Sequence, residues 1–287
     1  MSKRDGNDDA QETGKLAIIG GGKMGGTIAA RVVETGLLPG SRVVVSEPDE
    51  GTRARLEARM GGSDALSVIF DHAGAVRGAS TVVLAVTPQV MPVVLETLRG
   101  KLRPGQLAMS IAAGVELRTL HLGLDHAAII RVMPNTPAQV GEGISAWIAT
   151  GEVTPAQKME ARGILGAIGR ELEVDQERYM DMVTALSGSG PAWVMLMLEA
   201  MIEAGVNIGL RPDWARELAL QTMAGSVTLA RETGKHPAEL RSMVTTPAGT
   251  TAAGLYAMER GGVRSAIMSG IVAAYQRCLE LGAAARK

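Results

Sequence analysis

The sequence predicts a two-domain protein, in which an N-terminal α/β domain with a mostly parallel, doubly wound sheet precedes an all-α domain. Short apolar runs alternate with helical patterns up to about residue 178, as in parallel sheets that carry helices on both faces. From residue 179 onward, Ala, Met, Leu and Glu recur at helical spacing. The 287 residues suffice for two domains with separate cores. We therefore expect domains over residues 15–178 and 179–287, behind a disordered tail at 1–14.

The first domain is expected to begin with a strand at 16–19, a glycine turn and a helix at 27–35. Apolar, β-branched runs predict the later strands, and Gly, Pro and polar turns separate them from the helices. The later strands are expected at 42–46, 81–86, 107–111, 128–132 and 144–149, and the later helices at 51–60, 89–100 and from Thr154.

The second domain is expected to contain helices at 191–209, 212–233, 237–243, 251–260 and 263–281. Several begin with Pro and end at Gly, which is the usual asymmetry of helix ends. The segment from Trp193 to Leu198 is apolar on every face, and such a helix must be buried all round. A small helical domain has too little core to bury it, so we expect at least a homodimer.

Composition excludes several classes of function. A net charge of −1 and 2% aromatic residues predict no nucleic-acid partner. The apolar stretch at 191–210 is interrupted by Glu199, Glu203 and Asn207, so we expect no membrane span. Cys278 is the single cysteine, and His121 and His126 are poorly spaced for metal in an expected loop. We therefore expect no disulfide, no metal site and a cytoplasmic location.

The run Gly20-Gly21-Gly22-Lys23-Met24-Gly25 matches the pattern G-x-G-x-x-G. Here a strand precedes it and a helix follows, which is the context that gives the pattern meaning. Glycine permits the tight turn, close approach to a pyrophosphate and helix-on-strand packing. The sequence thus predicts a Rossmann-like dinucleotide site that includes Gly20, Gly22, Lys23, Met24 and Gly25.

The second strand ends at Ser46, and Glu47 follows where the adenosine ribose should lie. An acid there binds the ribose hydroxyls of NAD and repels the 2′-phosphate of NADP. Ser46, Thr52, Arg53 and Arg55 could instead contact that phosphate. These residues leave both coenzymes open.

The nicotinamide half of the coenzyme is expected at the carboxyl ends of later strands, where ligands bind in open α/β sheets. Asn135, between two prolines, is expected to orient either the coenzyme amide or the backbone, and a cis bond is an alternative there. The residues expected to meet the coenzyme are Val86, Thr87, Pro88, Ala112, Ala113 and Asn135.

The run from Thr245 to Thr251 places four hydroxyls and free backbone N–H groups at the start of a helix. Such a helix end binds a small carboxylate without a charged side chain. General acids are scarce in this half: His236 is expected to cap a helix, and Lys235 and Lys287 are the only lysines. An imine that is already protonated fits this inventory, with Thr251 hydrogen-bonded to its nitrogen. The alternatives are a hydroxyacid dehydrogenase and an NADP-sensing regulator without activity.

Several motifs, in this order and at these distances, resemble pyrroline-5-carboxylate reductase over nearly all of residues 15–282. They are G-G-G-K-M-G at 20–25, S-I-A-A-G-V at 110–115, V-M-P-N-T-P at 132–137, L-S-G-S-G-P-A at 186–192 and T-T-P-A-G-T-T-A-A-G-L at 245–255. The resemblance implies NAD(P)H-dependent reduction of 1-pyrroline-5-carboxylate to L-proline, the last step of proline biosynthesis. It favours NADP, with NAD as the alternative, and implies an intertwined dimer that forms a decamer in some members.

The resemblance also implies roles for individual residues. Thr251 matches the threonine that hydrogen-bonds the ring nitrogen, and Thr246, Gly249 and Thr250 match the loop that binds the substrate carboxylate. Two positions depart from the family's pattern. Thr87 replaces a usual lysine, which removes a positive charge near the coenzyme. Ala248 replaces a usual glycine, and this change is expected to be mild if Ala248 has a negative φ.

Overall fold

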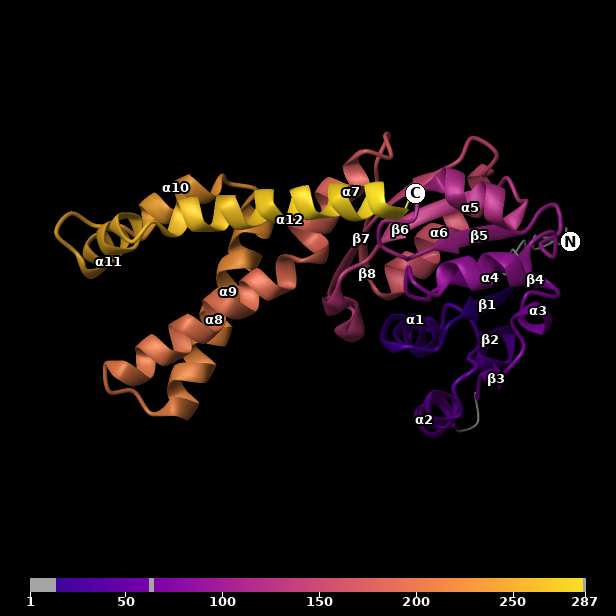
Figure 1. Cartoon of the computed structure of the whole chain (residues 1–287). Coiled ribbons are helices and arrows are strands. Elements are labelled where there is room, and N and C mark those ends of the chain that lie inside the picture. The colour runs from indigo at the N-terminus through magenta and orange to yellow at the C-terminus, as the bar shows by residue number, and fades with distance from the viewer. Residues whose placement is uncertain (1–13, 62–64, 286–287) are drawn as a thin grey trace, which may run out of the picture. The chain divides into compact units, whose positions relative to one another are not determined.

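The computed structural model describes residues 14–61 and 65–285; most of the expected N-terminal tail lies outside them. An eight-stranded sheet has the order β3-β2-β1-β4-β5-β6-β7-β8 (Figure 1). Every neighbouring pair is parallel except β6 and β7, which are antiparallel. The mostly parallel, doubly wound sheet is therefore confirmed.

The strands and the helices between them alternate along the chain. The strands are β1 (Lys15–Ile19), β2 (Val43–Ser46), β3 (Ser67–Ile69), β4 (Ala79–Leu84), β5 (Leu107–Ser110), β6 (Ile129–Met133), β7 (Gly143–Ala149) and β8 (Gly169–Glu173). The helices are α1 (Lys23–Glu34), α2 (Glu50–Met60), α3 (His72–Ala75), α4 (Met91–Leu98), α5 (Leu117–Leu124) and α6 (Pro155–Ala167).

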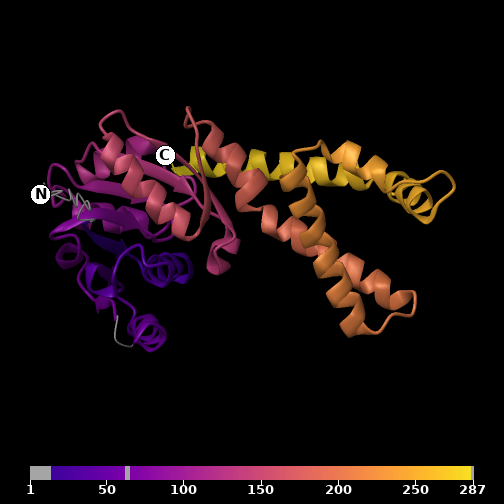
Figure 2. The same cartoon turned by 180° about the vertical axis from the view of Figure 1, so that it is seen from behind.

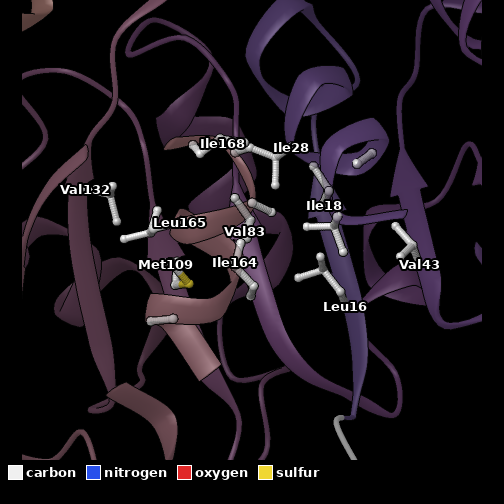
Figure 3. Packing of buried hydrophobic residues seen from close by; sticks show 14 of the residues in the cluster. Leu16, Ile18, Ile28, Val43, Val83, Met109, Val132, Ile164, Leu165 and Ile168 are labelled. Carbon is white, nitrogen blue, oxygen red and sulfur yellow. The ribbon is translucent and has the colours of Figure 1, made fainter. Parts of the chain in front are cut away.

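Side chains of β1 alternate between two apolar layers. Leu16 and Ile18 face the layer formed with α1 and α6, where Ile28 and Ile164 pack (Figure 3). Ala17 and Ile19 belong to the opposite layer, which includes residues of α3, α4 and α5. Both faces of β1 are therefore buried, which explains why its sequence is a continuous apolar run.

Several elements differ from the sequence expectation. Helix α1 begins four residues earlier than expected, because it includes the buried glycines Gly25 and Gly26, which pack closely against Gly20 and Leu56. Strands β3 and β8 and helices α3 and α5 were not expected, and the loop prediction for His121 is wrong, since it lies in α5. Elsewhere the expected strands and helices are present, with ends that differ by a few residues.

The C-terminal region is helical. It contains α7 (Tyr179–Val183), a π-helical turn (Thr184–Gly188), α8 (Gly190–Asn207), α9 (Pro212–Thr233), α10 (Pro237–Met243), α11 (Thr250–Arg260) and α12 (Val263–Ala285). By their contacts, the residues form two compact units. One runs to Gly188 and includes the chain from Cys278, and the other is Ser189–Arg277.

Within the second unit, α8 packs beside α9 (Figures 1 and 2). Although α8 is apolar, none of its residues is buried in the single chain, and Leu196 is 63% exposed. Among the described residues, the stretch Tyr179–Asn207 also has the length and composition of a membrane-spanning helix. A helix that a partner subunit covers passes the same test, so the expected all-round burial of α8 requires a surface from outside this chain.

Candidate functional site

The glycine turn between β1 and α1 has the geometry that a bound dinucleotide requires. Gly20 has a φ of +101°, which favours glycine, and a Cβ on Gly25 would lie 2.0 Å from the carbonyl oxygen of Gly20. A Cβ on Gly22 would meet no atom within 4 Å, so this side of the turn is open. Gly22 caps α1, and Lys23 and Met24 are in its first turn. Their amide groups lack intrahelical partners and are available to a phosphate.

Glu47 holds the glycine turn against the end of β2. Its Oε2 accepts a hydrogen bond from the backbone N–H of Gly21 at 2.8 Å, and its Oε1 accepts one from that of Asp49 at 2.9 Å. Ser46 is fully buried, and its hydroxyl is 2.7 Å from Nδ1 of His72. Burial lowers the pKa of His72. Ser46 is thus a buried residue that packs behind the turn, while Glu47 contacts the glycine turn directly.

The carboxyl ends of β4 and β5 border a cavity of about 460 Å³. Pro88 and Ala113, both expected to meet the coenzyme, are among its lining residues, with Asp181 and Cys278. Burial raises the pKa of the Cys278 thiol, with a smaller contribution from Asp181, so this thiol remains protonated at neutral pH. Cys278 is therefore not activated as a nucleophile in this cavity.

The remaining expected coenzyme residues are distributed around these strand ends. Val86 lies against the glycine turn, since a Cβ on Gly20 would come within 2.9 Å of its side chain. Thr87 is exposed, and its carbonyl oxygen accepts hydrogen bonds from the N–H groups that begin α4. Ala112 is buried next to Ala113.

Asn135 orients the backbone. Its Oδ1 accepts a hydrogen bond from the N–H of Ile144 at 2.9 Å, and its Nδ2 lies 3.4 Å from both the carbonyl and the hydroxyl of Ser187. No cis peptide bond occurs among residues 14–61 and 65–285. The cis alternative is therefore wrong, and the amide of Asn135 joins the end of β6 to the start of β7.

A buried arginine, which the sequence did not predict as part of the site, forms ion pairs with two partly exposed carboxylates beside the same cavity. Arg131 of β6 is almost fully buried and bonds Glu177 at 2.9 Å and Asp181 at 3.2 Å. Glu177 also accepts a hydrogen bond from the N–H of Leu117 at the start of α5. The network fixes α5 and α7 against the sheet, because a buried charge requires its partners. An arginine inside the apolar strand Ile129–Met133 was the available signal.

The threonine-rich run forms a turn that opens α11. The N–H of Gly249 donates to the carbonyl of Thr246 at 3.0 Å, so this donor is already used inside the turn. Ala248 has a φ of +61°. The replacement of the family's usual glycine by Ala248 was expected to be mild only with a negative φ, and this condition is not met. A left-handed conformation costs a non-glycine residue about 1–2 kcal/mol.

Neutral donors remain at the start of α11. Thr250 and Thr251 occupy its first two positions, where backbone N–H groups have no intrahelical acceptor. Within the described part of the chain, the hydroxyls of Thr246, Thr250 and Thr251 form no hydrogen bond. His236 caps α10 by accepting the N–H of Ala238 at 3.2 Å, as the sequence predicts. The turn can therefore bind an anion through neutral donors alone.

No cluster of three or more potential metal ligands occurs among the residues that the structure describes.

The doubly wound sheet, the open glycine turn and the helical C-terminal region together define a dinucleotide-dependent oxidoreductase of two-domain build.

Comparison with known proteins identifies the family. Residues 177–281 match the family model described as pyrroline-5-carboxylate reductase dimerisation, and residues 15–114 match the model for NADP oxidoreductase, coenzyme F420-dependent. The chain belongs to the pyrroline-5-carboxylate reductase family. The family's enzyme of Synechocystis is 43% identical over 93% of this chain and 98% of its own length, and that of Pisum sativum is 39% identical over 93% and 95%.

Solved structures agree with this assignment. The pyrroline-5-carboxylate reductase of Coxiella burnetii superposes with a TM-score of 0.86 at 32% identity, over 94% of this chain and 98% of that one. The pyrroline carboxylate reductase of Plasmodium falciparum, solved with NADP bound, gives a TM-score of 0.84 at 29% identity, over 94% and 99%. The fold expected from the sequence is thus confirmed in both halves.

Proposed function

We propose that this chain reduces 1-pyrroline-5-carboxylate to L-proline with NAD(P)H, the last step of proline biosynthesis. The threonine turn at the start of α11 carries the proposal, because it offers neutral donors to a small carboxylate and no strong acid. A hydroxyacid dehydrogenase would need a lysine or histidine beside the substrate. Family membership favours an active reductase over a coenzyme sensor.

The coenzyme half of the proposed site uses the glycine turn and the strand ends. The pyrophosphate would lie on the first amides of α1 beside Gly22, where the chain leaves open space. The relative from Plasmodium falciparum was solved with NADP bound, which supports the same class of coenzyme here. The coenzyme supplies the hydride that becomes bonded to the imine carbon.

The substrate half would hold the carboxylate and the ring nitrogen. The N–H groups of Thr250 and Thr251, with the hydroxyl of Thr246, would bind the carboxylate. The hydroxyl of Thr251 would hydrogen-bond the protonated ring nitrogen and orient the C=N bond. Once hydride adds to carbon, the C=N π electrons become the lone pair of the amine, so no proton from the enzyme is needed for this step.

Thr251→Ala tests this arrangement. We expect loss of most turnover with unchanged binding of the reduced coenzyme, because the coenzyme residues are in the other compact unit. The assay follows absorbance loss of NADPH or NADH with pyrroline-5-carboxylate, and fluorescence titration measures coenzyme binding. Thr251→Ser retains the hydroxyl and should recover much of the rate. Unchanged kinetics in Thr251→Ala would remove the proposed site.

We also propose that the helical region forms at least a homodimer in the cytoplasm. The exposed apolar surface of α8 and the match to a dimerisation model support this. We propose a decamer as the larger assembly. Light scattering at micromolar concentration separates these states, and a monomer would contradict the proposal.

A further inference from the structure

The turn between β2 and α2 carries two carboxylates where the adenosine ribose of a dinucleotide lies in this fold. Glu47 is fixed there by the N–H groups of Gly21 and Asp49, one on each carboxylate oxygen. Asp49 caps α2, and the hydrogen bond from Thr52 lowers its pKa. The charges of Arg55 and Arg53 lower the pKa of Asp49 further, so its carboxylate remains ionised at neutral pH.

Glu47 also has acceptor positions left for ribose hydroxyls. A carboxylate has about four acceptor positions, and the two backbone N–H groups occupy one on each oxygen. The remaining positions can accept from the 2′- and 3′-hydroxyls of an unphosphorylated ribose. Because its side chain is already ordered, little conformational entropy is lost when these bonds form.

The groups that could neutralise a 2′-phosphate are engaged elsewhere. The hydroxyl of Ser46 is buried against His72, whose pKa is lowered by burial, so this histidine is neutral at pH 7. The guanidinium of Arg53 donates to two backbone carbonyls of the β2–α2 turn and lies 5.9 Å from the ring of Phe70. Arg55 donates to the hydroxyl of a threonine one turn earlier in α2.

We propose that Glu47 makes this enzyme bind NADH more tightly than NADPH. The proposal rests on the proposed reductase function and narrows its coenzyme. The two coenzymes differ only in the 2′-phosphate, which carries nearly two negative charges at neutral pH. NADH has a 2′-hydroxyl at this position, which Glu47 can bind. NADPH has an anionic phosphate there, which Glu47 repels. The local carboxylate therefore outweighs the NADP preference that family resemblance implies.

The test measures the dissociation constants of NADH and NADPH by fluorescence titration without substrate. We expect the wild-type protein to bind NADH at least about tenfold more tightly, the effect of one charge interaction near a protein surface. Glu47→Gln should reduce the ratio of the two constants about tenfold. The ratio of the two dissociation constants is insensitive to a general disturbance of the β2–α2 turn, since both coenzymes share all other contacts.

The matched control is Glu57→Gln, which removes an exposed carboxylate from α2, the helix that follows the turn, and should leave the ratio unchanged. Competition by 5′-AMP and 2′,5′-ADP provides a second measurement restricted to the adenosine half. Added salt should weaken the discrimination, because it screens the repulsion.

Each outcome decides the proposal. Equal or tighter binding of NADPH by the wild-type protein overturns it, even if the reductase activity is present. An unchanged ratio in Glu47→Gln removes Glu47 as the cause. Binding of neither coenzyme overturns the proposal together with the proposed function. Tighter binding of NADH without turnover of pyrroline-5-carboxylate supports the preference and removes only the reductase function.

Discussion

Substitution of Gly249 by alanine should raise KM for the substrate and leave the coenzyme half intact. The added Cβ would lie 2.4 Å from the hydroxyl oxygen of Thr246, and this separation must grow by about 0.6 Å to reach the 3.0 Å that real contacts show. The hydroxyl must therefore leave its position. A hydrogen bond to a charged group contributes about 1.5–3 kcal/mol, so KM should rise about 10- to 150-fold.

The assay is initial-rate kinetics from the absorbance of the reduced coenzyme, with separate coenzyme titrations. Gly254→Ala is the matched control, because its added Cβ would meet no atom within 4 Å in the same helix. This control should stabilise α11 by about 0.8–1 kcal/mol and leave KM unchanged. Thr246→Val should reproduce the KM increase, since it removes the hydroxyl but retains the shape. An unchanged KM in Gly249→Ala would refute the assignment of Thr246 to carboxylate binding.

Two further predictions concern stability. Ala248→Gly relieves a left-handed residue, so denaturant unfolding at fixed protein concentration should show a gain of about 0.5–1 kcal/mol, after the entropic cost of glycine is subtracted; a loss would contradict the strain argument. Burial lowers the pKa of His72 below its ordinary 6.5, so the unfolded chain binds more protons just below pH 6.5 and the free energy of unfolding should fall on acidification there. Unfolding measured between pH 5 and 7.5 should show a weaker slope in His72→Gln, and an identical slope would exclude this histidine as the cause.

The sequence predicted most of the sheet because its central strands are buried on both faces and therefore read as apolar runs. It missed β8 because Gly169–Glu173 has only one apolar residue, Leu172, which is itself 53% exposed. It missed α5 because Gly123 interrupts the pattern. That glycine permits close packing on α4, since a Cβ there would lie 2.7 Å from the side chain of Leu95.

The site was predictable where it depends on local sequence. The glycine turn is one continuous motif, in which Gly20 has a positive φ, Gly25 packs against the carbonyl of Gly20, and Gly22 faces open space. Long-range partners could not be predicted from one sequence: Arg131 pairs with residues 46 and 50 positions away, and Asn135 bonds Ser187, 52 positions away. The positive φ of Ala248 was also missed, because the residue type argues against it.

The helical unit carries both the exposed threonine turn and an uncovered apolar helix. Thr246 and Thr250 are exposed in the single chain, and Thr251 is half-buried. Neutral donors bind a carboxylate weakly in water, because water competes for the same hydrogen bonds, and they bind it more strongly once water is excluded. The same unit leaves the apolar surface of α8 uncovered. A partner that buries this surface contributes hydrophobic stabilisation, and exclusion of water from the threonine turn would strengthen the binding of a carboxylate there.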